Sequence, residues 1–302
     1  MKQSNHIAFA ATIILLLAGC GKMTAPETGR EIRVEAGIGQ LTKVSYGADG
    51  ISTTFTAGDQ IAVYAWTGSA SAVPAKRVVD GVVNTLGDGG LWTPATPMLW
   101  APGGVQHYFL GIFPAPASVS SFTAAEYSLN PAAYTASDLC VATNLGGVTF
   151  SQGAVELVFD HLMAKLVVNL NFRSEFDGTP AVTSVTALAQ SAATVNYLEK
   201  TVLATGDPSA VNIPAAASAP TGYALGFSGL QVPQEGVRKI TVTIGGKAYV
   251  YESAADIPLV QGKYTTLGLL VGKEKIELTG ITLSDWTSAA DLSGGEAVQV
   301  FS

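Results

Sequence analysis

The chain has 302 residues, with 16 Lys and Arg against 23 Asp and Glu, so its net charge is −7. An acidic chain without a basic cluster has no electrostatic attraction for nucleic acid or anionic lipid, and we exclude nucleic acid as a partner. Hydrophobic residues make up 48%, which is enough for one or two cores of ordinary size without stabilising disulfides or metals.

The start of the chain predicts an exported lipoprotein. An apolar run at residues 7–18 is shorter than the roughly twenty residues of a membrane-spanning helix, which indicates a removable signal peptide over residues 1–19. The run ends in Leu17-Ala18-Gly19-Cys20, which resembles the lipobox of bacterial lipoproteins. The resemblance implies cleavage before Cys20 and a lipid on that cysteine, so that residues 20–30 tether the protein to the outer membrane. The alternative is an ordinary signal peptide that ends at a cysteine by chance.

The rest of the chain is patterned for β-strands. It contains 33 Gly and 14 Pro, and short apolar or alternating runs recur between these turn-forming residues. Short runs that are rich in β-branched and aromatic residues are typical of antiparallel all-β domains. We expect strands at residues 61–66, 107–113, 155–159, 166–172 and 276–283.

Two neighbouring runs differ in the phase of their alternation. Apolar side chains take odd positions over residues 155–161 and even positions over residues 166–172. A strand has a side-chain period of two, so the chain must bend or bulge at residues 160–165. Such a corner suits a chain that passes from one sheet to another. We therefore expect two Ig-like, Greek-key β-sandwich domains in tandem, over residues 31–152 and 153–302.

The sequence also predicts the register of one hairpin. Residues 238–244 and 247–251 flank Gly245-Gly246, a two-residue loop that favours a type I′ or II′ turn. Apolar residues of both strands share one face when the strands are paired outward from this loop. The expected pairs on that face are Ile244 with Lys247, Val242 with Tyr249, and Ile240 with Tyr251.

Residues able to carry catalysis are few. If Cys20 is acylated, Cys140 has no disulfide partner, and its apolar neighbours predict a small buried residue. A nucleophile at this position needs a His and a carboxylate from elsewhere in the fold. His107 and His161 lack metal-ligand spacing, and Asp160 and His161 are expected on opposite faces of a strand. We predict no enzyme, no metal site and no cofactor.

Several segments match the motifs of one family, in the same order along the chain. Residues 54–64 (TFTAGDQIAVY) fit the pattern F-x-x-G-D-x-I-x-V-Y, and residues 155–166 fit V-x-L-x-F-x-H-x-x-A-K-L. Further matching segments lie at residues 99–114, 138–142 and 258–286. By these segments the chain resembles the Mfa-like fimbrillins, the subunits of type V pili.

The resemblance to the fimbrillins implies a fold and a route of assembly. It implies two transthyretin-like β-sandwiches in a protein that reaches the cell surface as a lipoprotein precursor. A trypsin-like protease then cuts after an Arg or Lys near the N-terminus, and the first strand is lost. A strand from another pilus subunit fills the open groove by β-augmentation. The chain is thus expected to be a stalk, anchor or tip subunit of a fimbria, with a role in adhesion.

The N-terminal part of this chain offers residues for the cleavage step. Residues 32–36 alternate like a first strand, and glycines follow them. Lys43 precedes Val44 at the preferred candidate cleavage site, with Arg30 and Arg33 as rivals. A cut between Lys43 and Val44 removes both the lipid and the expected first strand.

The C-terminal tail offers residues for the donor strand. Val298 and Val300 alternate with polar or aromatic residues after a Gly-rich segment, so they can face a groove on another subunit. The tail can equally be the last strand of its own domain, and the sequence leaves both possibilities open.

A surface glycan-binding lipoprotein is the alternative function. It shares the signal, the tether and the all-β domains, and it binds host or bacterial glycans by stacking a sugar on a flat aromatic side chain. Trp92 is the tryptophan that we expect at the surface, whereas Trp66 and Trp100 belong to apolar segments and are expected in the core. A purely structural envelope lipoprotein is a third possibility.

Overall fold

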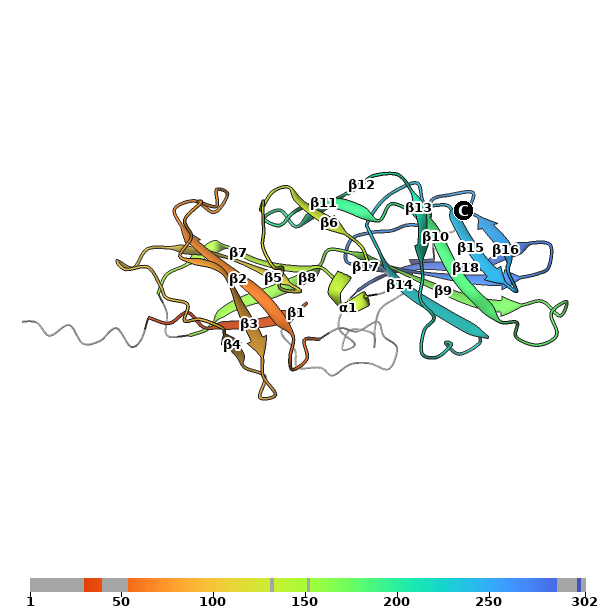
Figure 1. Ribbon diagram of the computed structural model, residues 1–302, viewed down its shortest axis with the longest axis horizontal. Helices are drawn as coiled ribbons and strands as arrows, with labels where there is room; N and C mark the ends of the chain where they lie inside the picture. The colour runs from red at the N-terminus through yellow and green to blue at the C-terminus, as the bar shows by residue number, and fades with distance from the viewer. Residues whose placement is uncertain (1–29, 40–53, 131–132, 151–152, 287–297, 300–302) are drawn as a thin grey trace, which may run out of the picture.

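The chain folds into an elongated arrangement of β-sheets, with two bodies placed along its long axis (Figure 1). The computed structural model describes residues 30–39, 54–130, 133–150, 153–286 and 298–299. Within these ranges the regular elements are strands, apart from the single helical turn α1 (Tyr134–Ser137). The predicted all-β fold is confirmed.

The first body is built on one seven-stranded sheet. Apolar side chains from alternate positions of its strands point inward and form a cluster that we call the inner core; it includes Ile61 and Val63, Phe109, and Leu157 and Phe159. The order of the strands across the sheet is β1 (Val34–Ile38), β8 (Val155–His161), β7 (Cys140–Val148), β5 (His107–Phe113), β2 (Gln60–Thr67), β3 (Val79–Leu86) and β4 (Trp92–Pro94).

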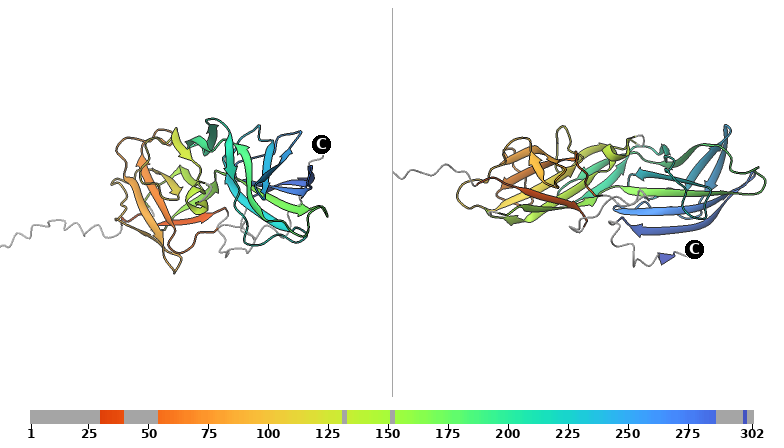
Figure 2. Two further views of the ribbon diagram at one scale, coloured as in Figure 1. Left: turned by 45° about the vertical axis from the view of Figure 1, so that its right-hand side comes forward. Right: turned by 90° about the horizontal axis from the view of Figure 1, so that it is seen from below.

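The second body contains two sheets. The four-stranded sheet has the order β13 (Ser209–Asn212), β10 (Val182–Ala189), β15 (Lys239–Ile244) and β16 (Lys247–Glu252). The five-stranded sheet has the order β14 (Leu225–Gln231), β9 (Ala164–Phe172), β17 (Lys263–Val271), β18 (Ile276–Asp285) and β19 (Val298–Gln299). Figure 2 shows these strands from two further sides.

The hairpin β15–β16 has the predicted register. Ile244 pairs with Lys247, Val242 with Tyr249, and Ile240 with Tyr251. Gly245 and Gly246 have φ values of 56° and 81°, the left-handed conformation that a type I′ turn requires at both positions. The strands expected from the other runs are present as β2, β5, β8, β9 and β18.

A third sheet joins the two bodies. It has the order β12 (Thr201–Thr205), β11 (Ala192–Asn196) and β6 (Ala125–Ser128), so β6 from the first half of the chain pairs with β11 from the second half, and β11 pairs in turn with β12. Tyr64 and Trp66 lie on the face of β2 that is opposite to the inner core. Together with Leu166 and Val168 of β9 they belong to one large buried cluster, which we call the main core. The main core therefore continues from one body into the other.

The expected corner between residues 160 and 165 is present, and it is where the chain changes sheets. β8 has alternating burial and lies in the seven-stranded sheet, while β9 lies in the five-stranded sheet. Leu162 and Met163 connect them and are fully buried. The phase change in the sequence thus marks the passage between sheets, as predicted.

The strand pairing differs from the expected division at residue 152. β8 follows that residue but pairs with β1 and β7 of the first body, and β11 pairs with β6. By its pairing, the chain leaves the seven-stranded sheet at Leu162 and Met163. The polar residues 151–153 signal a turn, but a turn signal does not show with which sheet the following strand pairs.

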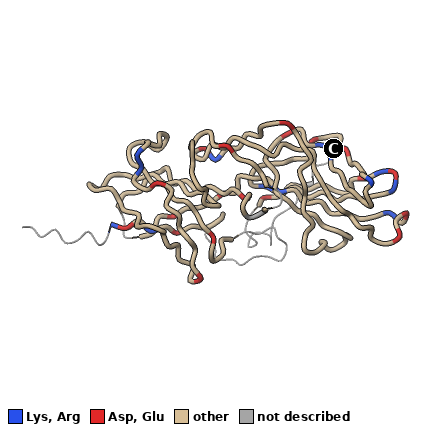
Figure 3. The backbone as a smooth tube through the Cα atoms, in the orientation of Figure 1, with Lys and Arg blue, Asp and Glu red and all other residues tan. Residues whose placement is uncertain are grey.

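Charged residues are scattered over the structure. In Figure 3, the Lys and Arg residues and the Asp and Glu residues lie at scattered places along the described chain, many of them in loops. In the part of the chain that the structure describes, no helix is long and apolar enough to cross a membrane.

Candidate functional site

The candidate functional site is the groove that holds β1. β1 runs parallel to β8, with Val34 opposite Val155 and Ile38 opposite Phe159. The Val155 N–H donates to the Arg33 carbonyl at 2.7 Å, and the Gly39 N–H donates to the Phe159 carbonyl at 3.0 Å. β1 therefore lies at one end of the seven-stranded sheet, with β8 as its neighbour in the sheet.

The residues before β1 are held by the loop that leads to β5. The Ile32 N–H donates to the Met98 carbonyl at 2.7 Å, and the Trp100 N–H donates to the Arg30 carbonyl at 2.9 Å. Glu31 and Leu99 form an antiparallel bridge between the two segments. The beginning of the segment thus has backbone partners on both sides.

The side chains of this segment alternate as the sequence predicts. Ile32 and Val34 have exposed fractions of 2% and 7% and belong to the inner core. Arg33 and Glu35 are exposed. The strand starts at Val34 and continues to Ile38, slightly later than the expected range 32–36, because the first residues bridge to Leu99 instead of β8.

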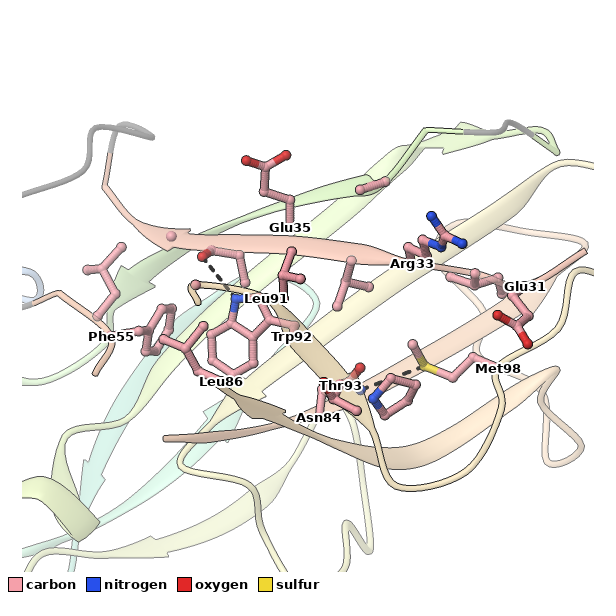
Figure 4. A pocket seen from close by; sticks show the side chains of 18 of the residues that line it. Glu31, Arg33, Glu35, Phe55, Asn84, Leu86, Leu91, Trp92, Thr93 and Met98 are labelled. Atoms are coloured by element: carbon pink, nitrogen blue, oxygen red, sulfur yellow. Dashed lines mark hydrogen bonds between the residues drawn. The ribbon is translucent and has the colours of Figure 1, made fainter. Parts of the chain in front are cut away.

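A cavity of about 990 Å³ lies between β1 and β4, the two end strands of the sheet (Figure 4). The Trp92 indole N–H donates to the Ala36 carbonyl at 3.3 Å, and this bond spans the gap between the two strands. Phe55 packs edge-on against Trp92, with ring centroids 5.1 Å apart, and edge-on against Phe159 at 5.3 Å. The cavity thus has aromatic walls beside the second half of β1.

The floor of the cavity carries one buried amide. Asn84 is fully buried, and its Nδ2 donates to the Val82 carbonyl at 2.9 Å and lies 3.7 Å from the Met98 sulfur. Its Oδ1 has no hydrogen-bond partner among the residues that the structure describes. Of the other charged or polar side chains that line the groove, Glu31, Arg33 and Glu35 belong to the β1 segment itself, and Thr54 and Thr93 belong to its walls. The rest of the lining consists of apolar side chains and backbone groups, which is the kind of surface that binds an extended apolar strand.

Of the candidate cleavage residues, the structure describes Arg30 and Arg33, and both have carbonyl groups in backbone hydrogen bonds. Arg33 has an exposed side chain, but its carbonyl is bonded to the Val155 N–H; the carbonyl of the half-buried Arg30 is bonded to the Trp100 N–H. Lys43 and Val44 lie outside the described residues, as does the lipidation candidate Cys20.

The candidate donor tail is described only in part. Val298 pairs with Leu283 and Gln299 pairs with Thr282, so β19 lies beside β18 of its own chain. Val300 lies outside the described residues.

The tryptophans are arranged largely as expected. Trp66 and Trp100 are buried, with exposed fractions of 0% and 3%, which confirms their predicted place in the core. Trp92 is half-buried, and its indole N–H is bonded to β1. It therefore faces the groove and does not form a flat surface platform while β1 is in place.

The structure brings together a cluster that the sequence reasoning missed. The Cys140 sulfur lies 3.2 Å from His161 Nδ1, which in turn lies 2.8 Å from Asp138 Oδ1. Cys140 and His161 are opposite each other in the pairing of β7 with β8. The missed signal was this register. Asp160, which was expected on the opposite face of the strand from His161, forms an ion pair with Lys200 at 2.7 Å.

The cluster of Asp138, Cys140 and His161 is sealed inside the protein. Their exposed fractions are 4%, 0% and 4%, and Trp286 stacks on the His161 ring at 4.0 Å. Burial, and then the charge of Asp138, raise the pKa of the Cys140 thiol well above its ordinary value, so the sulfur stays protonated. Three potential metal-ligand atoms lie within 4.8 Å of one another, but the enclosure and the protonated thiol fit a structural hydrogen-bond cluster better than a catalytic or metal site.

Residues 42–286 match the family described as fimbrillin-like. The chain belongs to this family. The match begins after β1 and ends at Trp286, the residue that stacks on His161. No protein among the curated ones matches the chain.

Solved structures with a similar fold include proteins from Bacteroides species. The fimbrillin-like chain is similar to a protein from Bacteroides uniformis, provisionally named a cell adhesion protein, with 19% identity and a TM-score of 0.64 over 87% of this chain and 100% of that one. A protein from Bacteroides ovatus with the same provisional name has 13% identity and a TM-score of 0.64, over 85% and 98%. A fimbrial protein from Bacteroides vulgatus has 11% identity and a TM-score of 0.50, over 85% and 100%. At these identities the likeness concerns the fold.

Proposed function

We propose that this fimbrillin-like chain is a structural or tip subunit of a cell-surface fimbria, with a role in adhesion and without enzymatic activity. It is exported as a lipoprotein and assembles with other pilus subunits by strand exchange. The observation that carries this proposal is the placement of β1: a short strand from the N-terminal segment closes the inner core at the end of a sheet. The family and the names of the similar structures support the fimbrial role.

Removal of β1 would leave a groove with the chemistry of a strand-binding site. The edge of β8 would lose the bonds at Arg33 and Gly39, and its N–H and C=O groups would be unpaired. The sites of Ile32 and Val34 would become empty apolar pockets. An exposed edge with alternating apolar pockets binds an extended strand through main-chain hydrogen bonds and side-chain burial.

Cleavage between Lys43 and Val44 suits this route better than cleavage at the rival sites. A protease binds its substrate in an extended, unpaired form, and the carbonyls of Arg30 and Arg33 are engaged in backbone bonds. Lys43 follows the strand and its bonds. A trypsin-like protease acting there releases the lipidated Cys20 together with β1.

The C-terminal tail is the proposed donor. Its described contact with its own chain is the two-residue pairing of Val298 and Gln299 with β18, which is short for a stable strand. Val298 and Val300 alternate like Ile32 and Val34, so they can take the same pockets on another subunit. If this chain is a tip subunit, the donor tail is not needed and the groove alone takes part in assembly.

Limited proteolysis followed by gel analysis tests the proposal. The folded chain treated with trypsin should be cut first after Lys43 and then form ladders in gels run without boiling. A variant without residues 297–302 should form weaker ladders, while the control Leu203→Ala, an exposed position, should behave like the original chain. First cleavage in an interior loop, or no ladders from any cut chain, would contradict assembly by this route.

The glycan-binding alternative makes a different demand on Trp92. A stacking platform needs a free aromatic face, and Trp92 is half-buried beside β1. The alternative therefore requires that β1 is removed or that the ligand enters the groove. Binding on a glycan array that disappears with Trp92→Ala would favour it; an empty array is the result that the fimbrial proposal expects for a stalk subunit.

A further inference from the structure

The groove is filled unevenly along the length of β1. Ile32 and Val34 are buried, whereas Ala36 and Ile38, which lie on the same face of the strand, are half-buried. On this face Ala36 lies between Val34 and Ile38, but its side chain is only a methyl group. The cavity of about 990 Å³ runs along the whole segment from Glu31 to Ile38, and Ala36 is the smallest of the inward side chains that face it. The space beside Ala36 is therefore not used by β1.

Large side chains from other segments line the cavity beside β1 (Figure 4). Trp92 is bonded to the Ala36 carbonyl at 3.3 Å, which holds its ring beside the strand. Phe55 contacts Trp92 edge-on with ring centroids at 5.1 Å. Leu86 is opposite Trp92 in the pairing of β3 with β4 and lines the same cavity. These walls are apolar and are supplied by β3, β4 and the segment before β2.

We propose that Phe55, Leu86 and Trp92 form a specificity pocket for the incoming strand of another pilus subunit. That strand places an apolar side chain of leucine size where β1 has Ala36. This inference rests on the proposed function, because it names the chemistry of the strand that replaces β1. Each additional buried methylene strengthens association about fourfold, so a strand that fills the pocket displaces one that carries alanine.

The charge and shape of the groove agree with such an occupant. The inward positions of β1 are apolar, while its outward positions carry Arg33 and Glu35, which are exposed. An incoming strand therefore needs apolar side chains at alternate positions. Of the described residues that line the cavity, the charged ones, Glu31, Arg33 and Glu35, belong to the segment that it replaces. The pocket at Ala36 selects among such strands by size.

Substitutions in the full chain test whether the pocket is vacant. Ala36→Leu should raise the Tm by about 2–6 °C, because it fills an apolar cavity without moving the strand. The matched control Glu35→Leu places the same side chain at the neighbouring exposed position and should not raise the Tm. An unchanged or lower Tm for Ala36→Leu would show that the position has no room, and would overturn the pocket.

Binding of labelled peptides tests whether the pocket selects the incoming strand. Peptides of residues 30–39 with the native sequence, with Ala36→Leu and with Glu35→Leu are titrated into the trypsin-treated full chain and followed by fluorescence anisotropy. The Ala36→Leu peptide should bind at least about tenfold more tightly than the other two. Equal affinities would overturn the pocket as a specificity site. If no peptide binds while Ala36→Leu still raises the Tm, the pocket is present and the strand-exchange proposal fails.

Discussion

The two cores of this protein are closed in different ways. The main core is crossed by β9, which lies between β14 and β17 in the middle of a sheet, with Leu166 and Val168 fully buried. The inner core is closed along one side by β1, a five-residue strand at the end of its sheet. The burial of the inward side chains decreases along this segment, from Ile32 before β1 and Val34 at its start to the half-buried Ala36.

This difference is one that the proposed strand exchange requires, because the core that joins the two bodies is separate from the strand that would be replaced. The main core continues through the joining sheet β12–β11–β6, so the two bodies are held together by strands from both halves. β1 contributes to the inner core but comes from the N-terminal segment, where its loss leaves the other strand pairings intact. Stability in proteins is commonly distributed unevenly in this way, and the less stable element is the one used in function.

A substitution in the main core should have the largest effect. Leu166→Ala removes a fully buried side chain between two neighbouring strands and should lower the free energy of unfolding by about 2–5 kcal/mol. Chemical denaturation measures this change. The control Leu203→Ala removes the same atoms from a side chain that is 70% exposed and should change stability by less than about 0.5 kcal/mol. Equal effects at both positions would contradict the assignment of the main core.

The corresponding substitution in β1 should have a smaller and more local effect. Ile32→Ala should destabilise the attachment of β1 by about 2 kcal/mol. This value is at the low end of the range for replacing a buried isoleucine by alanine, because β1 lies at the end of its sheet. The result is faster trypsin cleavage after Arg33, by up to about thirtyfold, since cleavage follows local opening. Glu35→Ala, at an exposed position, serves as the control. A loss of global stability as large as that of Leu166→Ala would contradict the separate behaviour of β1.

The buried thiol should contribute less. Cys140→Ala removes its contact with His161 and should cost about 1 kcal/mol, while leaving fibre assembly unchanged. In the original chain the thiol should react with an aromatic disulfide reagent only after unfolding, since burial raises its pKa and encloses the sulfur. Rapid reaction of the thiol in the native protein, or loss of fibre assembly in Cys140→Ala, would indicate a chemical role for the cluster.

The smallest expected effect is a pH dependence that arises in the inner core. Burial lowers the pKa of His107 below its ordinary value of 6.5, and its Nε2 accepts a hydrogen bond from the Ala101 N–H at 3.0 Å. Below pH 6.5 the unfolded chain therefore binds a proton that the folded chain does not, and stability falls as the pH falls. His107→Gln should reduce this slope between about pH 6.5 and 5, measured by unfolding midpoints. An identical slope in both proteins would show that His107 is not the cause.

Features that depend on neighbouring residues in the sequence could be predicted. The register of β15–β16 follows from the two-glycine turn, and the passage from β8 to β9 follows from the change of phase. In both cases the periodicity of a strand determines the result within a few residues.

Features that depend on pairing between distant segments could not be predicted. β1 pairs in parallel with β8, and β6 pairs with β11, although these segments lie far apart in the sequence. Their alternation shows which face of each strand is apolar, but it does not show which strand is the partner. The same limit applies to the cluster around His161, because the register of β7 with β8 places Cys140 opposite it. The vacancy at Ala36 is likewise defined by side chains from other strands.

The central claim is that β1 is removed and replaced when the subunit assembles. The most direct measurement is the N-terminal residue of the protein in fibres isolated from cells, determined by mass spectrometry. The strand-exchange account predicts that the chain in fibres begins at Val44, without Cys20 and without β1. Fibres in which the chain begins at an acylated Cys20, with Ile32 and Val34 still present, would contradict it.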